Sequence, residues 1–92
     1  MMARFNFTKD ADAVLDWTFD WSEWLHSGET IVSAVVTPDS GLTIDSTTAG
    51  DTSVVAWISG GTPGNMYRVG CRVTTSDSRI DERSINVRVL ER

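Results

Sequence analysis

The stretch LDWTFDWSEWL, residues 15–25, holds three of the chain's four tryptophans within eight residues. Apolar residues occupy positions 15, 17, 19 and 21, whereas polar residues occupy positions 16, 18 and 20. This period of two is typical of a strand with one buried face. Because the other face is polar, we expect Leu15, Trp17, Phe19 and Trp21 to lie in a core. The cluster is then core material, although flat indoles also serve as ligand platforms.

The pattern changes after this strand. Ser22 can cap one short helical turn over residues 22–26, which would tuck Trp24 or Leu25 under the strand end. A single domain of 92 residues buries only roughly 60–65% of its unfolded surface. Large aromatic side chains add much buried area per residue, so tryptophans are an economical way to build a small core.

The rest of the chain alternates strand-like segments with turn sequences. Strands are predicted at 30–37, 42–45, 52–59, 67–75 and 80–90, separated by PDSG, STTAGD, GGTPGN and SDS. No segment has the period of an amphipathic helix. Residues 13–92 are therefore predicted to form an all-β domain, an antiparallel immunoglobulin-like β-sandwich of about seven strands.

The last two strands form a predicted hairpin with one buried face. Alternation places seven of its residues inside, namely Tyr67, Val69, Cys71, Val73, Ile85, Val87 and Val89. Tyr67 also follows a glycine-rich turn, which is the position of a tyrosine corner in this fold. In 52–59 the parity is ambiguous, and we favour Val54, Ala56 and Ile58 inside with Trp57 partly exposed.

Residues 1–12 are interpreted as an N-terminal arm. Phe5 and Phe7 alternate with Arg4 and other polar residues, so the arm could add a strand to a neighbouring sheet edge. A disordered terminus, or one packed on its own domain, remains open.

Charge is unevenly distributed along the chain. Residues 1–61 carry two cations against nine acids, a net charge of −7, whereas residues 62–92 carry six cations against four acids, a net charge of +2. Arg68, Arg72 and Arg88 have the same outward parity on adjacent strands. We expect them to dock a partner protein together with Arg4, Phe5 and Phe7 of the arm. On this hypothesis, deletion of residues 1–8 blocks incorporation into a larger particle and leaves the fold intact.

Residues with recognisable site chemistry are sparse. One cysteine, Cys71, excludes an intrachain disulfide, and one histidine, His26, gives neither a zinc set nor a nucleophile–base pair. The aspartates at 10, 12, 16 and 20 lack an EF-hand pattern, and GGTPG lacks the lysine of a phosphate loop. We therefore expect no enzyme activity, no metal and no cofactor. With no basic cluster, signal peptide or apolar run of membrane length, we expect neither nucleic acid nor membrane as partner.

Three non-enzymatic classes remain. A carbohydrate-binding module would use Trp57 or Trp24. An immunoglobulin-like module of a bacterial surface protein would need an export signal, which the sequence does not show. An assembly component would dock other proteins through strand edges and charged faces.

A resemblance bears on this choice. From about Lys9 to Arg92, the chain resembles small virion proteins of tailed phages called fiber–tail adaptor proteins. Five features in order carry the resemblance: Asp20–Trp21, Trp24–Leu25, Gly60–Gly61, Tyr67 and Arg83–Ser84. Trp17 and Ala11 stand where tyrosine and proline are expected, and Asp77-Ser78 replaces a glycine-containing turn.

The resemblance implies a virion structural role and no catalytic residue. It predicts an adaptor that joins tail or baseplate proteins to fibers, assembles in the host cytoplasm, and is present in multiple copies in a symmetric particle. A decoration protein of the head or connector is the remaining structural alternative.

Overall fold

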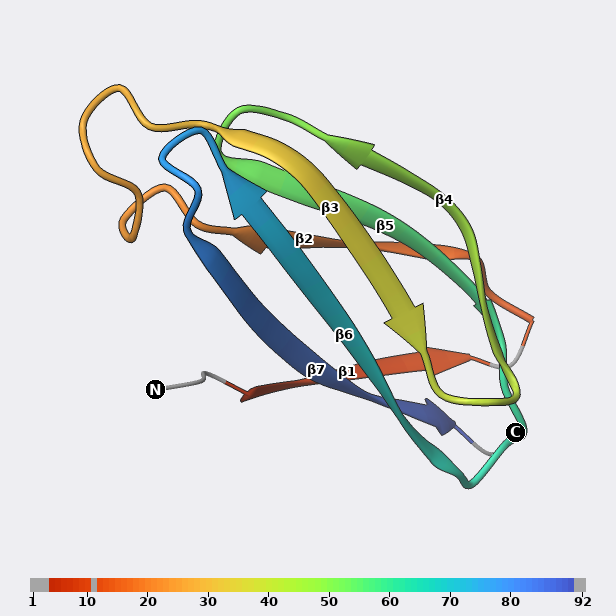
Figure 1. Cartoon of the computed structure of the whole chain (residues 1–92). Helices are drawn as coiled ribbons and strands as arrows, with labels where there is room; N and C mark the ends of the chain where they lie inside the picture. The colour runs from red at the N-terminus through yellow and green to blue at the C-terminus, as the bar shows by residue number, and fades with distance from the viewer. Residues whose placement is uncertain (1–3, 11, 91–92) are drawn as a thin grey trace.

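Two stacked β-sheets make up the molecule (Figure 1). The computed structural model describes residues 4–10 and 12–90, with side chains from Thr8 onward. Its seven strands are β1 (Arg4–Asp10), β2 (Leu15–Asp20), β3 (Ile31–Pro38), β4 (Leu42–Ala49), β5 (Ser53–Gly60), β6 (Met66–Thr75) and β7 (Ile80–Leu90). The predicted all-β sandwich of about seven strands is confirmed. The described residues contain no helix, and hence none long and apolar enough to cross a membrane.

The strand order is that of an immunoglobulin-like domain. One sheet has the order β1-β7-β6-β3 and the other β2-β5-β4. These neighbours reproduce the CFG and BED strand sets of that fold. All pairings are antiparallel except that of β1 with β7, which is parallel and was not anticipated from the sequence.

Strand β1 accounts for most of the segment interpreted as an arm. It pairs with β7 of its own chain from Arg4 opposite Ser84 to Asp10 opposite Leu90, so the self-packed alternative is the arrangement observed. Lys9 in this strand is buried, and its Nζ donates 2.8 Å hydrogen bonds to the carbonyls of Asp10 and Gly60. Deletion of residues 1–8 would therefore remove most of an edge strand, and the expectation that it leaves the fold intact needs correction.

The core lies between the sheets and is built from alternate residues of β5, β6 and β7. Trp21 has no exposed surface, and its ring lies 6.1 Å from that of Phe19. Leu15 and Trp17 are half-buried, with Trp17 packed on the core. The remaining buried apolar residues are Ile31, Leu42, Val54, Ala56, Ile58, Tyr67, Val69, Cys71, Val73, Ile85, Val87 and Val89.

A hydrogen-bonded turn follows β2, where the sequence predicted a helical turn. The N–H groups of Trp24 and Leu25 both donate to the carbonyl of Trp21, at 2.9 and 3.1 Å. The turn does not continue into a helix because the N–H of His26 donates to the Glu29 side chain instead. Asp20 rather than Ser22 supplies an accepting side chain at the start of the turn, since the N–H of Ser22 donates to Asp20 Oδ1. Trp24 and Leu25 still pack against the core as half-buried residues.

The turn between β5 and β6 contains the predicted tyrosine corner. The buried Tyr67 accepts a 2.8 Å hydrogen bond at its hydroxyl from the N–H of Thr62. Gly61 sits against this ring with a φ of +93°. A Cβ at Gly61 would lie 2.5 Å from Val89 Cγ2, so the turn requires glycine for both its conformation and its packing.

Strand β4 runs four residues beyond its predicted end at Asp45. The register against β5 shifts between Ile44 and Ser46, which marks a bulge at Asp45. The chain then continues as a strand through the threonines that sequence reasoning assigned to a loop. A bulge of this kind inserts one residue and still allows the ladder to resume.

Candidate functional site

The outer face of the four-stranded sheet carries the three arginines singled out in the sequence. Arg68, Arg72 and Arg88 are all exposed, on β6 and β7. Arg88 pairs with Met66, so it lies diagonally next to Arg68. Arg72 lies four residues further along β6, about 13 Å away at the usual strand rise, and pairs with Glu82. The structure therefore brings Arg68 and Arg88 together and places Arg72 beside an acid.

Exposed apolar side chains share this face, and no pattern in the sequence indicates them. Val35 pairs with Arg72, Met66 pairs with Arg88, and Ile80 pairs with Thr74. All three are largely exposed. Val35 sits in an apolar run, and only the register of the bulged edge strand β3 shows which of its residues face outward. Arginine and methionine together are characteristic of protein interfaces.

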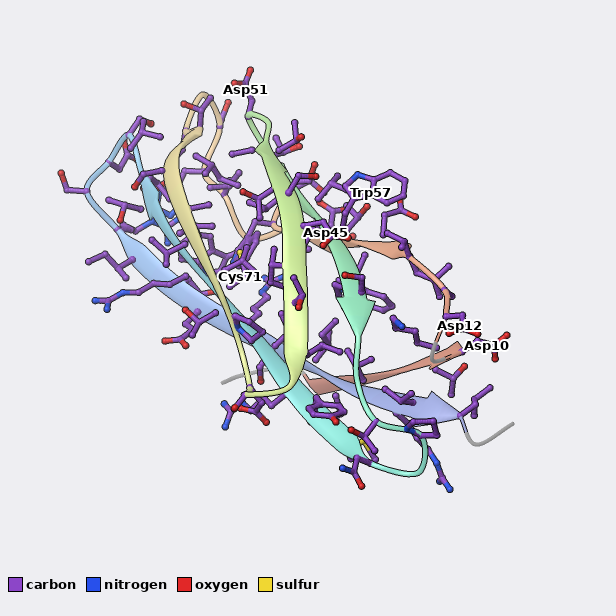
Figure 2. All side chains as sticks on the ribbon, turned by 90° about the vertical axis from the view of Figure 1, so that its right-hand side faces the viewer. Asp10, Asp12, Asp45, Asp51, Trp57 and Cys71 are labelled. Atoms are coloured by element: carbon purple, nitrogen blue, oxygen red, sulfur yellow. The ribbon has the colours of Figure 1, made fainter. Side chains whose placement is uncertain are left out.

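The outer face of the three-stranded sheet has a different character. Its central residue is Trp57, which is 41% exposed and pairs with Asp16 on one side and Ser46 on the other. Asp45 lies at the adjacent bulge and accepts a 2.8 Å hydrogen bond from Ser59 Oγ. Figure 2 shows Trp57 projecting from the ribbon near Asp45, with Cys71 in the interior. This face therefore presents an indole flanked by carboxylates.

Charge is divided between the two sheets. No lysine or arginine occurs between Lys9 and Arg68, so β2, β3, β4 and β5 carry none. Exposed Asp16, Asp20 and Asp45 make the outer face of the three-stranded sheet acidic. The uneven charge along the sequence thus becomes a charge difference between opposite faces of the sandwich.

A buried ion pair fixes the loop between β2 and β3. Arg79 donates to both carboxylate oxygens of Glu29, whose side chain is fully buried, and Thr75 Oγ1 donates to the same carboxylate. The hydrogen bond from Arg79 holds the pKa of Glu29 far below its usual range. The guanidinium also lies 4.0 Å from the centre of the Trp24 ring. Trp24 is therefore covered by a cation and offers no open ring face to a sugar on that side.

Three potential metal ligands meet next to this pair. His26, Glu29 and Asp77 bring ligand atoms within 4.8 Å of one another. However, both oxygens of Glu29 already accept hydrogen bonds from Arg79, Thr75 or the His26 backbone. The carboxylate is thus committed to the ion pair, and we assign no metal to this cluster.

A small cavity of about 130 Å³ opens between β2 and β7. It is lined by Trp17, Thr18, Phe19, Asp20, Arg83 and Ser84. The Arg83 guanidinium lies 4.9 Å from the centre of the Trp21 ring at this edge and donates to the Asp20 carbonyl. The lining combines the core side chains Trp17 and Phe19 with three polar residues and the arginine that covers Trp21, and it contains no nucleophile–base pair.

Cys71 is a buried core residue. Burial raises the pKa of its thiol to about 12, with the charge of Glu82 adding to the effect. The thiol therefore stays protonated near neutral pH, unlike a reactive cysteine.

The arm residues chosen as docking candidates lie on β1. The backbones of Arg4, Phe5 and Phe7 pair with Ser84, Ile85 and Val87, and their side chains lie outside the described part of the chain. Their docking role stays a hypothesis.

Comparison with known proteins gives a family match. The family model of the podophage GP4 fiber-tail adaptor protein gp77 matches residues 9–88. A search of curated proteins found no match. The matched range contains β2 to β6 completely, the last two residues of β1, and all of β7 except Val89 and Leu90. The chain therefore belongs to the family of podophage fiber-tail adaptor proteins.

Proposed function

We propose that this protein is a structural adaptor of a phage virion, which joins tail or baseplate proteins to fibers by protein–protein contacts. The observation that carries the proposal is the family match over residues 9–88. An immunoglobulin-like sandwich with few chemically reactive side chains in its described part suits a structural role. Assembly in the host cytoplasm, in multiple copies per particle, belongs to the same proposal.

The docking surface in this proposal is the outer face of β6 and β7, called here the arginine face and defined by Arg68, Arg72 and Arg88. Its support is the shared exposure of the three arginines with Val35 and Met66 close by. Cations next to apolar side chains favour both the steering and the burial of a partner. The edge of β1, which bears Arg4, Phe5 and Phe7, is the second proposed contact, because an outermost strand can accept a strand from a neighbour.

Virion incorporation tests the proposal. We expect the triple variant Arg68→Glu/Arg72→Glu/Arg88→Glu to be absent from purified particles, as measured by mass spectrometry. Arg→Lys changes at the same positions keep the charge, and Asp12→Lys with Asp51→Lys alters exposed loop charges elsewhere. Both controls should enter particles, and near-ultraviolet circular dichroism should show native folding for all variants. Normal incorporation of the Glu variant would refute the arginine face as the docking surface.

One observation favours a second candidate. Trp57 is exposed between carboxylates, as in a carbohydrate-binding surface. A glycan titration followed by tryptophan fluorescence should then give a shift that Trp57→Ala removes. The same titration with Val55→Ala, a change on the same strand face, provides the control.

A further inference from the structure

The two outer faces of the sandwich are complementary to each other. The acidic face, defined here by Asp16, Trp57 and Asp45, lies on a sheet without any lysine or arginine. The arginine face presents three cations, with Glu82 on it and Asp39 at its end as the nearby acids. Opposite charge on two faces of one chain is the arrangement that allows copies of that chain to attract each other.

We propose that copies of this protein stack front to back, with the arginine face of one copy on the acidic face of the next. The inference rests on the proposed docking role of the arginine face and identifies its occupant as a second copy. Trp57 lies at the centre of the contact, where it receives an arginine from the neighbour.

The chemistry around Trp57 fits a guanidinium. Arginine stacks on aromatic faces while its N–H donors reach carboxylates, and Asp16 and Asp45 lie on either side of this indole. The chain uses the same contact internally, since Arg79 lies 4.0 Å over Trp24 and Arg83 lies 4.9 Å over Trp21. Trp57 lies on β5, and neither β5 nor its neighbours β2 and β4 carry a lysine or arginine. An arginine stacked on this indole must therefore come from outside the three-stranded sheet.

The architecture determines the type of assembly. The two faces lie on opposite sides of a two-layer sandwich (Figure 1), so each copy uses different surfaces toward its two neighbours. Such a heterologous contact leaves one free face at each end and therefore builds a closed ring or a filament rather than a two-fold dimer. The two longer dimensions of the molecule are 45 and 25 Å. A face of this size can supply the ~800 Å² that each partner buries in a standard interface.

Two variants, each with one face inactivated, test the stack in solution. The first neutralises the arginine face by Arg68→Gln, Arg72→Gln and Arg88→Gln. The second neutralises the acidic face by Asp16→Asn, Trp57→Ala and Asp45→Asn. Neutral residues are used because charge reversal on both faces would create a new attraction. Thermal melts establish that each variant is folded before its association is measured by sedimentation velocity at 50 mM salt.

We expect the wild-type chain to form species larger than a dimer, and each variant alone to be monomeric. An equimolar mixture should give a one-to-one dimer and nothing larger, because each partner contributes its single intact face. Raising the salt to 500 mM should weaken wild-type association by about tenfold or more, since exposed charges are screened.

Three results would overturn the proposal: a wild-type chain that is monomeric up to millimolar concentration, single variants that associate like the wild type, or a mixture that stays monomeric. A monomeric wild type whose Trp57→Ala change abolishes a glycan response would point to carbohydrate binding at the acidic face. A monomeric wild type whose Arg→Glu variant still fails to enter particles would refute stacking and leave the adaptor proposal standing. A chain that stacks in solution but is absent from virions would support stacking and refute the adaptor proposal.

Discussion

The indole N–H of Trp21, the residue that follows β2, donates a 2.8 Å hydrogen bond to Oδ2 of Asp81, which lies 60 positions away on β7 of the opposite sheet. The tryptophan has no exposed surface, so this donor depends on the protein for its partner. The bond closes the end of the sandwich that Arg83 also covers. The tryptophan cluster thus supplies both apolar packing and one polar link between the layers.

Replacing Asp81 tests this link. Asp81→Ala leaves a buried N–H without its acceptor, and we expect it to lower the free energy of unfolding by about 1–3 kcal/mol, measured by urea denaturation. Asp81→Asn retains an acceptor oxygen and should cost clearly less. Equal stability of the Ala variant and the wild type would show that the hydrogen bond makes no net contribution.

Two glycines with positive φ provide a matched pair. Gly61→Ala should cost about 2–5 kcal/mol, because left-handed backbone strain adds to a clash in a filled core. Gly28 has a φ of +80° and nothing within 4 Å of a new Cβ, so Gly28→Ala should cost only the strain, about 1–2 kcal/mol. Urea denaturation of both variants separates the cost of backbone strain from the cost of the clash. Equal losses in the free energy of unfolding would contradict the role of the contact with Val89.

The tyrosine corner can be weakened without changing the core volume. Tyr67→Phe removes the oxygen that accepts from the Thr62 N–H, and we expect a loss of about 1 kcal/mol in the free energy of unfolding. Tyr67→Leu also removes the ring and serves as the reference for lost packing. If the Phe variant matches the wild type, the hydroxyl contact contributes nothing to stability.

The Glu29–Arg79 pair predicts a specific acid sensitivity. The pKa of Glu29 is held far below its ordinary value of 4.5 by the hydrogen bond from Arg79. Its stabilising contribution is therefore complete above about pH 4.5 and is lost as the pH falls toward the folded-state pKa. Glu29→Gln should be less stable at pH 7, and the difference from the wild type should shrink between pH 5 and pH 3. A constant difference across that range would rule out this linkage.

The thiol of Cys71 should be inert in the folded protein. It is fully buried, and its pKa is raised to about 12. We expect a thiol reagent at pH 8 to react only after urea unfolds the chain, with absorbance as the measurement. Fast modification of the native protein would mean that the sandwich opens locally far more often than its packing indicates.

Alternation predicted the fold because burial in a sandwich has the same period as the pleat. Phe19 and Trp21 lie inside, as the alternation of residues 15–21 predicts. In β5 alternation left the parity ambiguous, and the preference of an amphipathic indole for a partly exposed position favoured the observed arrangement, with Val54 inside and Trp57 outside. The alternation of side chains between the two faces of a strand is a local property, so it can be recognised from a single sequence.

Features that depend on distant partners could not be predicted in this way. The parallel pairing of β1 with β7 joins the two ends of the chain, and no local pattern specifies it. The exposure of Val35 depends on the bulge after Ile31, and the extension of β4 depends on the bulge at Asp45. Likewise, parity placed the arginines on one outer face, but only the register shows that Arg72 sits beside Glu82 rather than with Arg88.

The division of charge between the sheets also determines how the protein responds to trypsin, which cleaves after lysine and arginine. With no such residue between Lys9 and Arg68, the three-stranded sheet has no cleavage site. A tryptic digest therefore yields residues 10–68 as one long peptide, and a second protease that cuts at acidic residues is needed to cover it. In the native protein, the exposed sites at Arg68, Arg72 and Arg88 belong to the arginine face. Their protection from limited proteolysis would thus be a direct footprint of whatever covers that face.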